Sequence, residues 1–392
     1  MRPLDGITVV ALEHAVAAPF ATRQLADLGA RVIKVERPKV GDFARSYDET
    51  VLGMSSHFVW LNRSKQSVTL DLKHPDARTV MNRLIAMADV FVQNLAPGAA
   101  ARLGLGAEEL TATHPRLIVC DISGYGGSGP FRDKKAYDLL TQCEAGLVSI
   151  TGTRDSLAKT GISTADIGAG MYAYSGILSA LYLRERTGKG TRFEVSMFEA
   201  LGEWMGYPLY YTHFGGTPPQ RTGASHATIY PYGPFEAGDG KSVVLGLQNE
   251  REWVLFCEQV LQSPEVAADP RFSTNTRRVA NRPDLAKIIH RVFRGLTAAE
   301  LLDRLDRAQI ASARINSMED VWQHPQFQAR QRWRTVDTPE GPIPALIPPC
   351  TFAGFEARMD PIPALGAHTD QVLTEIGYDG ADIARLRTEE VV

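Results

Sequence analysis

The sequence has few cysteines, and they form no pattern of a metal site or disulfide framework. Cys120, Cys143, Cys257 and Cys350 lie far apart, with no CxxC pair and no histidine at ligand spacing. This usage is typical of a reducing compartment, and we expect all four to be buried thiols. The chain also lacks HExxH, GxSxG and EF-hand patterns, so the sequence indicates neither a metal site nor a serine hydrolase.

The chain also lacks an excess of charge of either sign and a long apolar run. It has 42 Lys and Arg against 45 Asp and Glu, a formal net charge of −3, which argues against nucleic-acid or membrane-surface binding. The longest nearly apolar stretch, Met171–Leu183, is too short to cross a bilayer. Arg2 and Asp5 precede a predicted strand, which differs from a signal or transit peptide. We therefore expect a cytoplasmic protein without nucleic-acid or membrane partners.

What the sequence does contain, up to about residue 200, is an alternation of strands and helices. Gly6–Leu12 is a short apolar run rich in β-branched residues, which predicts a buried strand, and residues 20–29 have helical spacing. This alternation predicts an α/β fold with a Rossmann-like, doubly wound parallel sheet. Further strands are predicted at 32–35, 67–72, 90–93, 117–122 and 193–196, and a long helix at 164–184.

The loop after the first predicted strand, residues 13–19, contains no glycine. A dinucleotide site needs G-x-G-x-x-G there, so that backbone N–H groups can approach the pyrophosphate. Glu36 occupies the place of the acidic ribose ligand, but Arg37 follows it directly. The sheet therefore resembles a nucleotide-binding sheet without the usual site, which argues against a dinucleotide-dependent oxidoreductase.

The pattern changes after the predicted sheet, and we divide the chain into four parts. Residues 1–200 are predicted to form the large Rossmann-like domain and 201–224 a linker. Residues 225–325 are predicted to form a smaller α+β domain, and 326–392 a segment that returns to the large domain. In the smaller domain, Asp239-Gly240 indicates a hairpin before a strand at 242–247. Thr297 and Glu300 match a capping box at the start of a helix.

Several basic side chains gather near the predicted ends of strands. The carboxyl ends of the strands form the ligand crevice of a doubly wound sheet. Cations there suit a multiply phosphorylated ligand, although each one alone is more often a solvated surface charge. The residues concerned are Arg37, Asn62-Arg63-Ser64-Lys65, Lys73, Asn94, Arg102, Lys134 and Lys135.

Asp166 stands where the long helix is predicted to begin, and two interpretations are open. It could be an N-cap that contributes about 1 kcal/mol, or a carboxylate nucleophile that the helix N-terminus keeps ionised. Gly168 and Gly170 are costly in a first helical turn, by about 1 kcal/mol each. They would let a bulky group reach the carboxylate, or let another helix pack closely. From these residues alone the cap is favoured.

Nine segments, taken together, resemble the family III CoA transferases, and they cover almost the whole chain in the family's order. The family includes formyl-CoA transferase, carnitine-CoA transferase, succinyl-CoA-dependent dicarboxylate CoA transferases and α-methylacyl-CoA racemase. The segments are PLDGITVV, AAPFATRQLADLGARVIKVERPKVGD, NRSKQSVTLDLKHPDA, VFVQNLAPGAAARLGLG, ISGYGGSGP, KAYDLLTQ, ADIGAGMYA, RTGKG and LGAHTDQVLTEIGY.

The resemblance implies a reaction and a set of contacts. Asp166 stands at the position of the family's catalytic aspartate, which forms an aspartyl anhydride with the acyl group and then an aspartyl-CoA thioester. No cofactor is implied beyond the coenzyme A thioester substrate, and the family forms interlocked homodimers. By family position, Arg37 and Arg102 should lie near the CoA phosphates. The remaining implied CoA contacts are Val16, Ala17, Leu70, Lys73, Asn94, Leu95, Lys135 and Tyr137.

The resemblance favours the dicarboxylate branch, with transfer of CoA from an acyl-CoA such as succinyl-CoA to itaconate, mesaconate, glutarate or malate. The segments RTGASHATIYPYGPF and LGLQNEREW look most like that branch. Formyl-CoA transferase has glutamine where Val16 stands, and its tetraglycine loop is replaced here by the stretch 223–226, which argues against an oxalate-specific enzyme. We hypothesise that Arg221 or His226 meets the distal carboxylate of a dicarboxylate.

Three alternatives stay open at this point. The first is a racemase of the same fold, but Tyr137 occupies the place of the racemase histidine, and a tyrosine with a pKa of about 10 is a poor base at neutral pH. The second is transfer of CoA between two carboxylates of one molecule, as in a mesaconyl-CoA C1–C4 transfer. The third is an inert CoA-binding protein, in which Asp166 would have no catalytic role.

Overall fold

The computed structural model describes residues 1–392 and divides them into two compact units. Unit 1 contains residues 1–146, 160–206 and 327–392, and unit 2 contains 147–159 and 207–326. The units differ from the sequence-based ranges in two places. Residues 147–159 belong with unit 2, and the stretch expected as a linker contains helix α10 (Gly206–Gly215).

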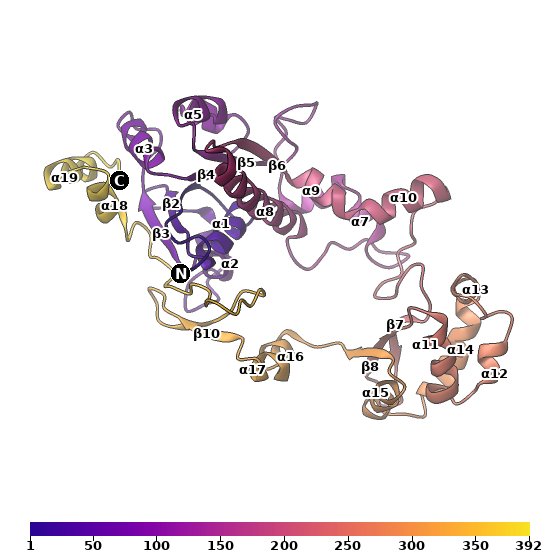
Figure 1. The fold of residues 1–392 in the computed structure, drawn as a ribbon. Coiled ribbons are helices and arrows are strands. Elements are labelled where there is room, and N and C mark those ends of the chain that lie inside the picture. The colour runs from indigo at the N-terminus through magenta and orange to yellow at the C-terminus, as the bar shows by residue number, and fades with distance from the viewer. The chain divides into compact units, whose positions relative to one another are not determined.

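Unit 1 is built on a six-stranded sheet in the order β3-β2-β1-β4-β5-β6 (Figure 1). All five strand pairs are parallel, so the predicted α/β fold with a parallel sheet is confirmed. The strand order reverses between β1 and β4, which is the switch point where such sheets bind ligands. The strands are β1 (Thr8–Leu12), β2 (Arg31–Glu36), β3 (Lys65–Thr69), β4 (Val90–Gln93), β5 (Ile118–Ser123) and β6 (Arg192–Ser196).

Helices cover both faces of this sheet. On one face, α3, α5, α18 and α19 pack against a core that includes Val10, Leu12 and Ile33, so the C-terminal helices are part of unit 1. The other face is covered by α1 and α8, which pack against each other (Figure 1). The helices are α1 (Ala17–Asp27), η1 (Phe43–Ser46), α2 (Ser56–Leu61), α3 (Ala77–Ala86), α4 (Ala99–Arg102), α5 (Ala107–Thr113), α6 (Asp138–Glu144), α8 (Thr164–Thr187), α9 (Met197–Trp204), α18 (Thr369–Glu375) and α19 (Gly380–Thr388).

The two glycines near the start of α8 serve close packing. A Cβ atom at Gly170 would lie 2.7 Å from the carbonyl oxygen of Ala17, so a side chain there would push α8 away from the start of α1. A Cβ atom at Gly168 would lie 3.4 Å from the indole of Trp204. The close helix contact considered from the sequence is therefore present at Gly170.

Unit 2 contains a three-stranded antiparallel sheet in the order β7-β8-β9, with helices around a core that includes Trp253, Phe256 and Phe293. The predicted hairpin and the capping box of Thr297 and Glu300 are confirmed. The elements are α7 (Leu147–Ile150), β7 (Tyr232–Glu236), β8 (Ser242–Gly246), α11 (Glu250–Leu255), η2 (Phe256–Val260), α12 (Glu265–Ala268), α13 (Asn275–Ala280), α14 (Arg282–Phe293), α15 (Ala298–Arg307), β9 (Ala311–Arg314) and α16 (Met318–Trp322). Helix α17 (Pro325–Ala329) follows, and the hairpin of β10 (Trp333–Val336) and β11 (Ile343–Leu346) belongs to unit 1.

Two further expectations concern the surface of the chain. None of the helices combines the length with the apolar character that crossing a bilayer requires. Cys120 and Cys257 are buried, but Cys143 and Cys350 are exposed. The expectation of four buried thiols is therefore wrong for two of them, because Cys143 lies on the outer side of the short helix α6 and Cys350 lies outside any helix or strand.

Candidate active site

The residues implied as CoA contacts follow the carboxyl ends of the strands. Because the strands are parallel, these ends meet at one edge of the sheet. Val16 and Ala17 are buried where α1 begins, and Leu70 is buried directly after β3. Asn94 and Leu95 follow β4 and are half-buried, whereas the exposed residues are Arg37, Lys73, Arg102, Lys135 and Tyr137.

The segment 62–65 does not contribute cations to this edge, so that part of the expected basic cluster is wrong. Arg63 is buried and donates from Nε and Nη2 to the two carboxylate oxygens of Asp27, each at 2.8 Å. Lys65 is the first residue of β3, and its buried ammonium lies 2.7 Å from a carboxylate oxygen of Glu13. Both cations are neutralised inside the protein, which a one-dimensional pattern of charges cannot show. Lys134 is also paired, with Glu144 on α6.

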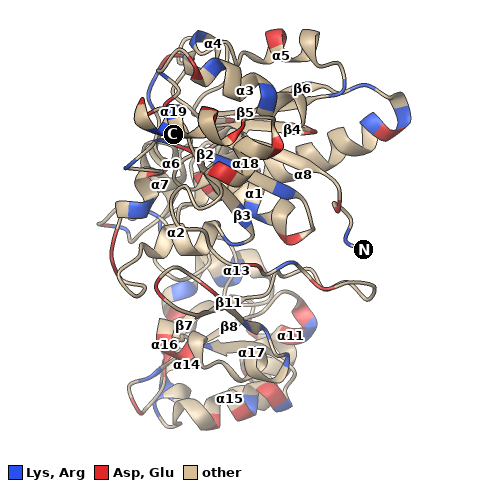
Figure 2. Ribbon diagram, turned by 90° about the vertical axis from the view of Figure 1, so that its left-hand side faces the viewer, with Lys and Arg blue, Asp and Glu red and all other residues tan.

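The charges of the whole chain are otherwise mixed. In Figure 2, Lys and Arg are interspersed with Asp and Glu along the helices and loops of the visible face. Four cations at the carboxyl edge have no acidic partner within ion-pair distance, which sets them apart from Arg63, Lys65 and Lys134. They are Arg37, Lys73, Arg102 and Lys135, and a multiply phosphorylated ligand would find all four available.

The structure tests one of the two interpretations of Asp166, its role as the N-cap of α8. Helix α8 begins at Thr164, so Asp166 lies in the first turn and is not the N-cap. The capping role belongs to Asp138 at the start of α6, whose Oδ1 accepts from the backbone N–H groups of Ala165 at 2.8 Å and Asp166 at 3.3 Å. Gln142 donates to the other oxygen of Asp138 at 2.7 Å. The carboxylate of Asp166 itself accepts no hydrogen bond, so the cap interpretation is wrong.

The environment of Asp166 changes its acidity. Burial, together with the nearby charge of Asp138, raises the pKa of Asp166 to about 7. The expectation that the helix N-terminus holds this group ionised is therefore outweighed by desolvation. A carboxylate with a higher pKa is also a stronger base and a stronger nucleophile once it is ionised.

This raised pKa predicts a pH-dependent effect on stability. Because the folded protein holds the Asp166 proton more tightly than the unfolded chain, the group destabilises the fold as pH rises from about 4 to about 7. Asp166→Asn removes that cost, so we expect it to stabilise the protein by roughly 2–4 kcal/mol at pH 8. The gain should be smaller at pH 5. Thermal unfolding of both proteins at the two pH values measures it.

A matched control is Asp155→Asn, which changes an exposed aspartate. Its unfolding temperature should stay close to that of the wild type at both pH values. An Asp166→Asn protein that is less stable than the wild type at pH 8 would contradict the predicted cost of ionising this half-buried carboxyl.

Tyr47 lies close enough to Asp166 for the charge of that carboxyl to act on its phenol, and the sequence analysis did not name it. Burial raises its pKa to about 12, and the charges of Asp42, Asp166 and Tyr137 act in the same direction. The phenol therefore keeps its proton and can donate a hydrogen bond beside Asp166. Tyr47 lies at the end of η1, next to the rings of Phe43 at 5.8 Å and His57 at 5.4 Å. A lone tyrosine after a short 3₁₀ turn carries no sequence signal that could have identified it.

The glycine loop after β5 is less available to a ligand than its sequence suggests. The N–H of Gly126 donates to the hydroxyl of Ser123 at 2.9 Å, and the N–H of Gly127 donates to Glu194 at 2.8 Å. These two donors already have partners within the protein, so the free protein does not present them to an anionic intermediate.

Arg221 and His226 have structural contacts within unit 2. The guanidinium of Arg221 donates to the carbonyl oxygens of Ser149, Thr153 and Arg154. The Nδ1 atom of His226 accepts from two backbone N–H groups three or fewer residues ahead, and the ring stacks on Tyr232. These contacts hold the segment 149–154 and the turn before β7. A contact of either residue with a substrate carboxylate stays a prediction.

Comparison with known proteins gives consistent results across the chain. The family model described as CoA-transferase family III matches residues 4–369. The chain is 33% identical to the succinyl-CoA:glutarate CoA-transferase of Mus musculus, over all of this chain and 91% of that protein. It is also 33% identical to the succinate–glutarate CoA-transferase of Agrobacterium fabrum, over 95% of this chain and 96% of that protein.

A solved structure agrees with these sequence matches. The crystal structure of a CAIB/BAIF family protein from Brucella suis superposes with a TM-score of 0.83 at 33% identity, and covers 96% of this chain and 99% of that one. The parallel sheet, the smaller antiparallel sheet and the free aspartate at the start of α8 thus occur in a chain that matches the family model almost from end to end. This protein belongs to the CoA-transferase family III.

Proposed function

We propose that this enzyme moves CoA from a dicarboxylyl-CoA, with succinyl-CoA as the first candidate, to a carboxylic acid acceptor such as glutarate, itaconate, mesaconate or malate. The names of its relatives support a dicarboxylate, since they include succinyl-CoA:glutarate, succinyl-CoA–D-citramalate, succinyl-CoA–L-malate and succinyl-CoA:mesaconate transferases. Transfer between two carboxylates of one molecule uses the same chemistry and is included in the proposal.

The observation that carries the proposal is the free carboxylate of Asp166. Asp138 occupies the cap of α8, so both oxygens of Asp166 lack a hydrogen-bond donor. Desolvation raises its pKa to about 7, and a poorly solvated carboxylate is a more reactive nucleophile than one surrounded by water. A single carboxylate of this kind is what covalent acyl exchange requires.

In each step of the proposed reaction, one bond to a carbonyl carbon forms and one breaks. An oxygen of Asp166 attacks the thioester carbonyl, a C–O bond forms, the C–S bond breaks and CoA leaves as the thiolate. The thiolate then attacks the aspartyl carbon of the anhydride, which releases the donor acid and leaves an aspartyl-CoA thioester. The acceptor carboxylate then attacks the aspartyl-CoA thioester, which releases the CoA thiolate and forms an anhydride between Asp166 and the acceptor. The thiolate attacks the acceptor's carbonyl carbon in this anhydride, which gives the new acyl-CoA and frees the carboxylate of Asp166. Splitting the exchange in this way replaces one difficult step by several easier ones.

The CoA itself is proposed to lie along the carboxyl edge of the sheet. Val16 and Ala17 would line its path, and the unpaired cations Arg37 and Arg102 would meet its phosphates. The hydroxyl of Tyr47 would donate to an oxygen of the species bound at Asp166, because its pKa keeps it protonated. The remaining proposed contacts are Leu70, Lys73, Asn94, Leu95, Lys135 and Tyr137.

Trapping the covalent intermediate tests this proposal. The enzyme is incubated with succinyl-CoA, treated with hydroxylamine or borohydride, digested and analysed by mass spectrometry. We expect a modification confined to the peptide that contains Asp166, and no modification in the Asp166→Asn protein. An unmodified Asp166 peptide in a preparation that still exchanges CoA would overturn the assignment of the nucleophile.

We also propose a homodimer. Support comes from α10, which exposes five large apolar side chains, more than an isolated helix of ten residues normally leaves in water. Light scattering after gel filtration should give twice the chain mass of 43.0 kDa, and a mass equal to one chain would contradict the proposal. The side chains are Tyr207, Leu209, Tyr210, Tyr211 and Phe214.

A further inference from the structure

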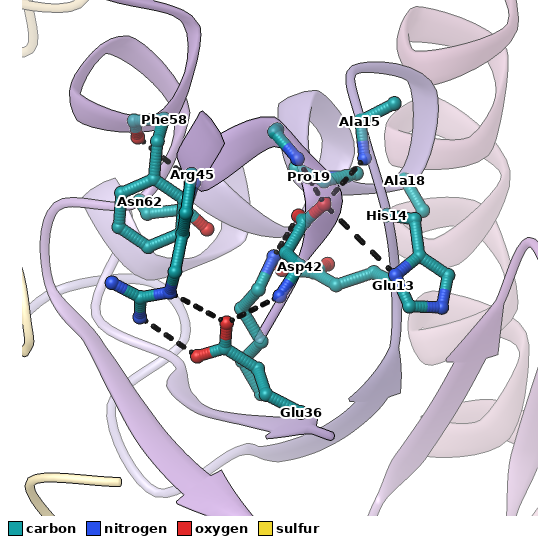
Figure 3. Close-up of polar contacts among 12 residues, drawn as sticks. Glu13, His14, Ala15, Ala18, Pro19, Glu36, Asp42, Arg45, Phe58 and Asn62 are labelled. Atoms are coloured by element: carbon teal, nitrogen blue, oxygen red, sulfur yellow. Dashed lines mark hydrogen bonds and ion pairs between the residues drawn. The ribbon is translucent and has the colours of Figure 1, made fainter. Parts of the chain in front are cut away.

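Four charged side chains form a network in the interior of unit 1. Figure 3 labels its two acids, Glu13 and Asp42, beside the loop that contains His14 and Ala15. Lys34 lies 2.7 Å from Asp42 and 3.5 Å from Glu13, and Lys65 lies 2.7 Å from Glu13. All four side chains have an exposed fraction of 0%. Two lysines and two acids balance each other in charge.

Stability alone gives little reason for such a network. Burying an ion pair costs several kcal/mol per ion in desolvation, and well-packed apolar residues often serve stability equally well. What an apolar cluster cannot do is accept hydrogen bonds from the backbone.

Two members of the network reach the backbone: Lys65 donates to the carbonyl oxygen of Pro19 at 3.1 Å, and Asp42 accepts from two backbone N–H groups. Its Oδ1 accepts from the N–H of Ala15 at 3.1 Å and from the N–H of Ala44 at 2.9 Å, while Lys34 donates to Oδ2. One carboxylate therefore ties the loop after β1 to the start of η1, and the ammonium of Lys34 keeps that carboxylate in place.

The loop that Asp42 holds is in a conformation that needs support. Ala15 has a φ of 58°, in the left-handed region, which is unfavourable for a residue with a Cβ atom. Asn94 holds the preceding residue, accepting from the N–H of His14 and donating to its carbonyl oxygen, both at 2.9 Å. Three consecutive backbone contacts thus fix the chain directly before Val16 and the start of α1.

We propose that Asp42 is a positioning residue of the CoA site, which holds Ala15 in its left-handed conformation and so sets the position of the start of α1, where Val16 and Ala17 lie. This inference rests on the proposed function, because that function places CoA along Val16 and Ala17. Lys34, Glu13 and Lys65 support Asp42 and do not touch the ligand themselves.

The binding of CoA to the Asp42→Asn protein, measured by isothermal titration calorimetry, tests the proposal. Both oxygens of Asp42 face donors, and an amide has only one acceptor atom, so the asparagine loses the contact with either Lys34 or Ala15. We expect CoA to bind at least tenfold more weakly. The matched control is Asp27→Asn, which removes the charge of another buried aspartate, 2% exposed and paired with Arg23 and Arg63. Its affinity should stay within twofold of the wild type.

A second substitution separates positioning from general loss of structure. Glycine adopts a positive φ without the cost that alanine pays. The double variant Ala15→Gly, Asp42→Asn should therefore bind CoA at least threefold more tightly than the Asp42→Asn protein. Weak binding in Asp42→Asn without any recovery in the double variant would overturn the positioning role.

The remaining outcomes distinguish this inference from the proposed function. If the wild type and the Asp42→Asn variant bind CoA equally well, the inference is overturned and the proposed function is not. Wild-type protein that does not bind CoA overturns both. If Asp42→Asn does not fold, hydrogen exchange on the wild-type peptide containing Ala15 decides the question. Protection of this amide before CoA is added supports the inference, and exchange at the rate of an unstructured peptide overturns it.

Discussion

Asp166→Asn is expected to reduce CoA transfer by a factor on the order of 10⁴ or more, while CoA still binds. An amide oxygen is a poor nucleophile, so neither the anhydride nor the aspartyl-CoA thioester can form. The shape of the side chain and the packing of α8 against α1 are unchanged. Transfer from succinyl-CoA to glutarate, followed by chromatography of the two CoA thioesters, measures the rate, and calorimetric titration measures the binding of CoA.

Asp138→Asn is the matched control for this prediction. Its oxygen can still accept from the N–H of Ala165 and so keep the cap of α8. Desolvation still raises the pKa of Asp166, but the smaller contribution from the negative charge of Asp138 is gone. Transfer by the wild type should fall about tenfold per pH unit below pH 7 and level off above it. In Asp138→Asn the midpoint should move to lower pH. A rate in Asp166→Asn above one hundredth of wild type would contradict the covalent role.

The sheet could be predicted from the sequence because each strand is a local signal. Runs such as Thr8–Leu12 are apolar and β-branched, and the helices between them have their own spacing. The strand β3 was placed two residues late, since it begins with Lys65 and Gln66. Their polar side chains give no sign that Lys65 is buried against Glu13. The stretch 201–224 is expected to be a linker, but residues 206–215 of it form α10. Pro208 lies in the first turn of α10, where its missing N–H is tolerated.

The sequence could predict that the candidate residues follow the carboxyl ends of the strands, but it could not predict their contacts. Asp166 could be located, but the sequence could not show that Asp138, from a different helix, takes over the cap of α8. The prediction that Arg63 and Lys65 belong to the basic cluster is wrong for the same reason, because their acidic partners lie far away in the sequence. Arg63 meets Asp27 and Lys65 meets Glu13 across 36 and 52 residues of chain. A charge count along the sequence treats these two cations and two acids as free charges. In the folded protein they neutralise each other in the interior.

The buried network gives the second large prediction, a strong loss of stability in Lys34→Met. Burial opposes the charged form of this lysine, but Glu13 and Asp42 outweigh burial and raise the pKa of Lys34. Methionine fills a similar volume but leaves Asp42 with no cation in contact, 0% exposed to water. Removing one partner of a buried pair costs about 3–5 kcal/mol. We expect calorimetry to show a fall in the unfolding temperature of unit 1 on the order of 10 °C.

Lys39→Met is the control, because the same change is made five residues further along the chain. Lys39 pairs with Glu390, but the two side chains are 72% and 71% exposed, and such a surface pair contributes about 0–1 kcal/mol. Its unfolding temperature should therefore stay within about 2 °C of the wild type. Equal, small effects of the two substitutions would mean that water or a proton compensates the acids around Lys34. In that case the network could not hold Asp42 rigidly, and the positioning of Ala15 would need another cause.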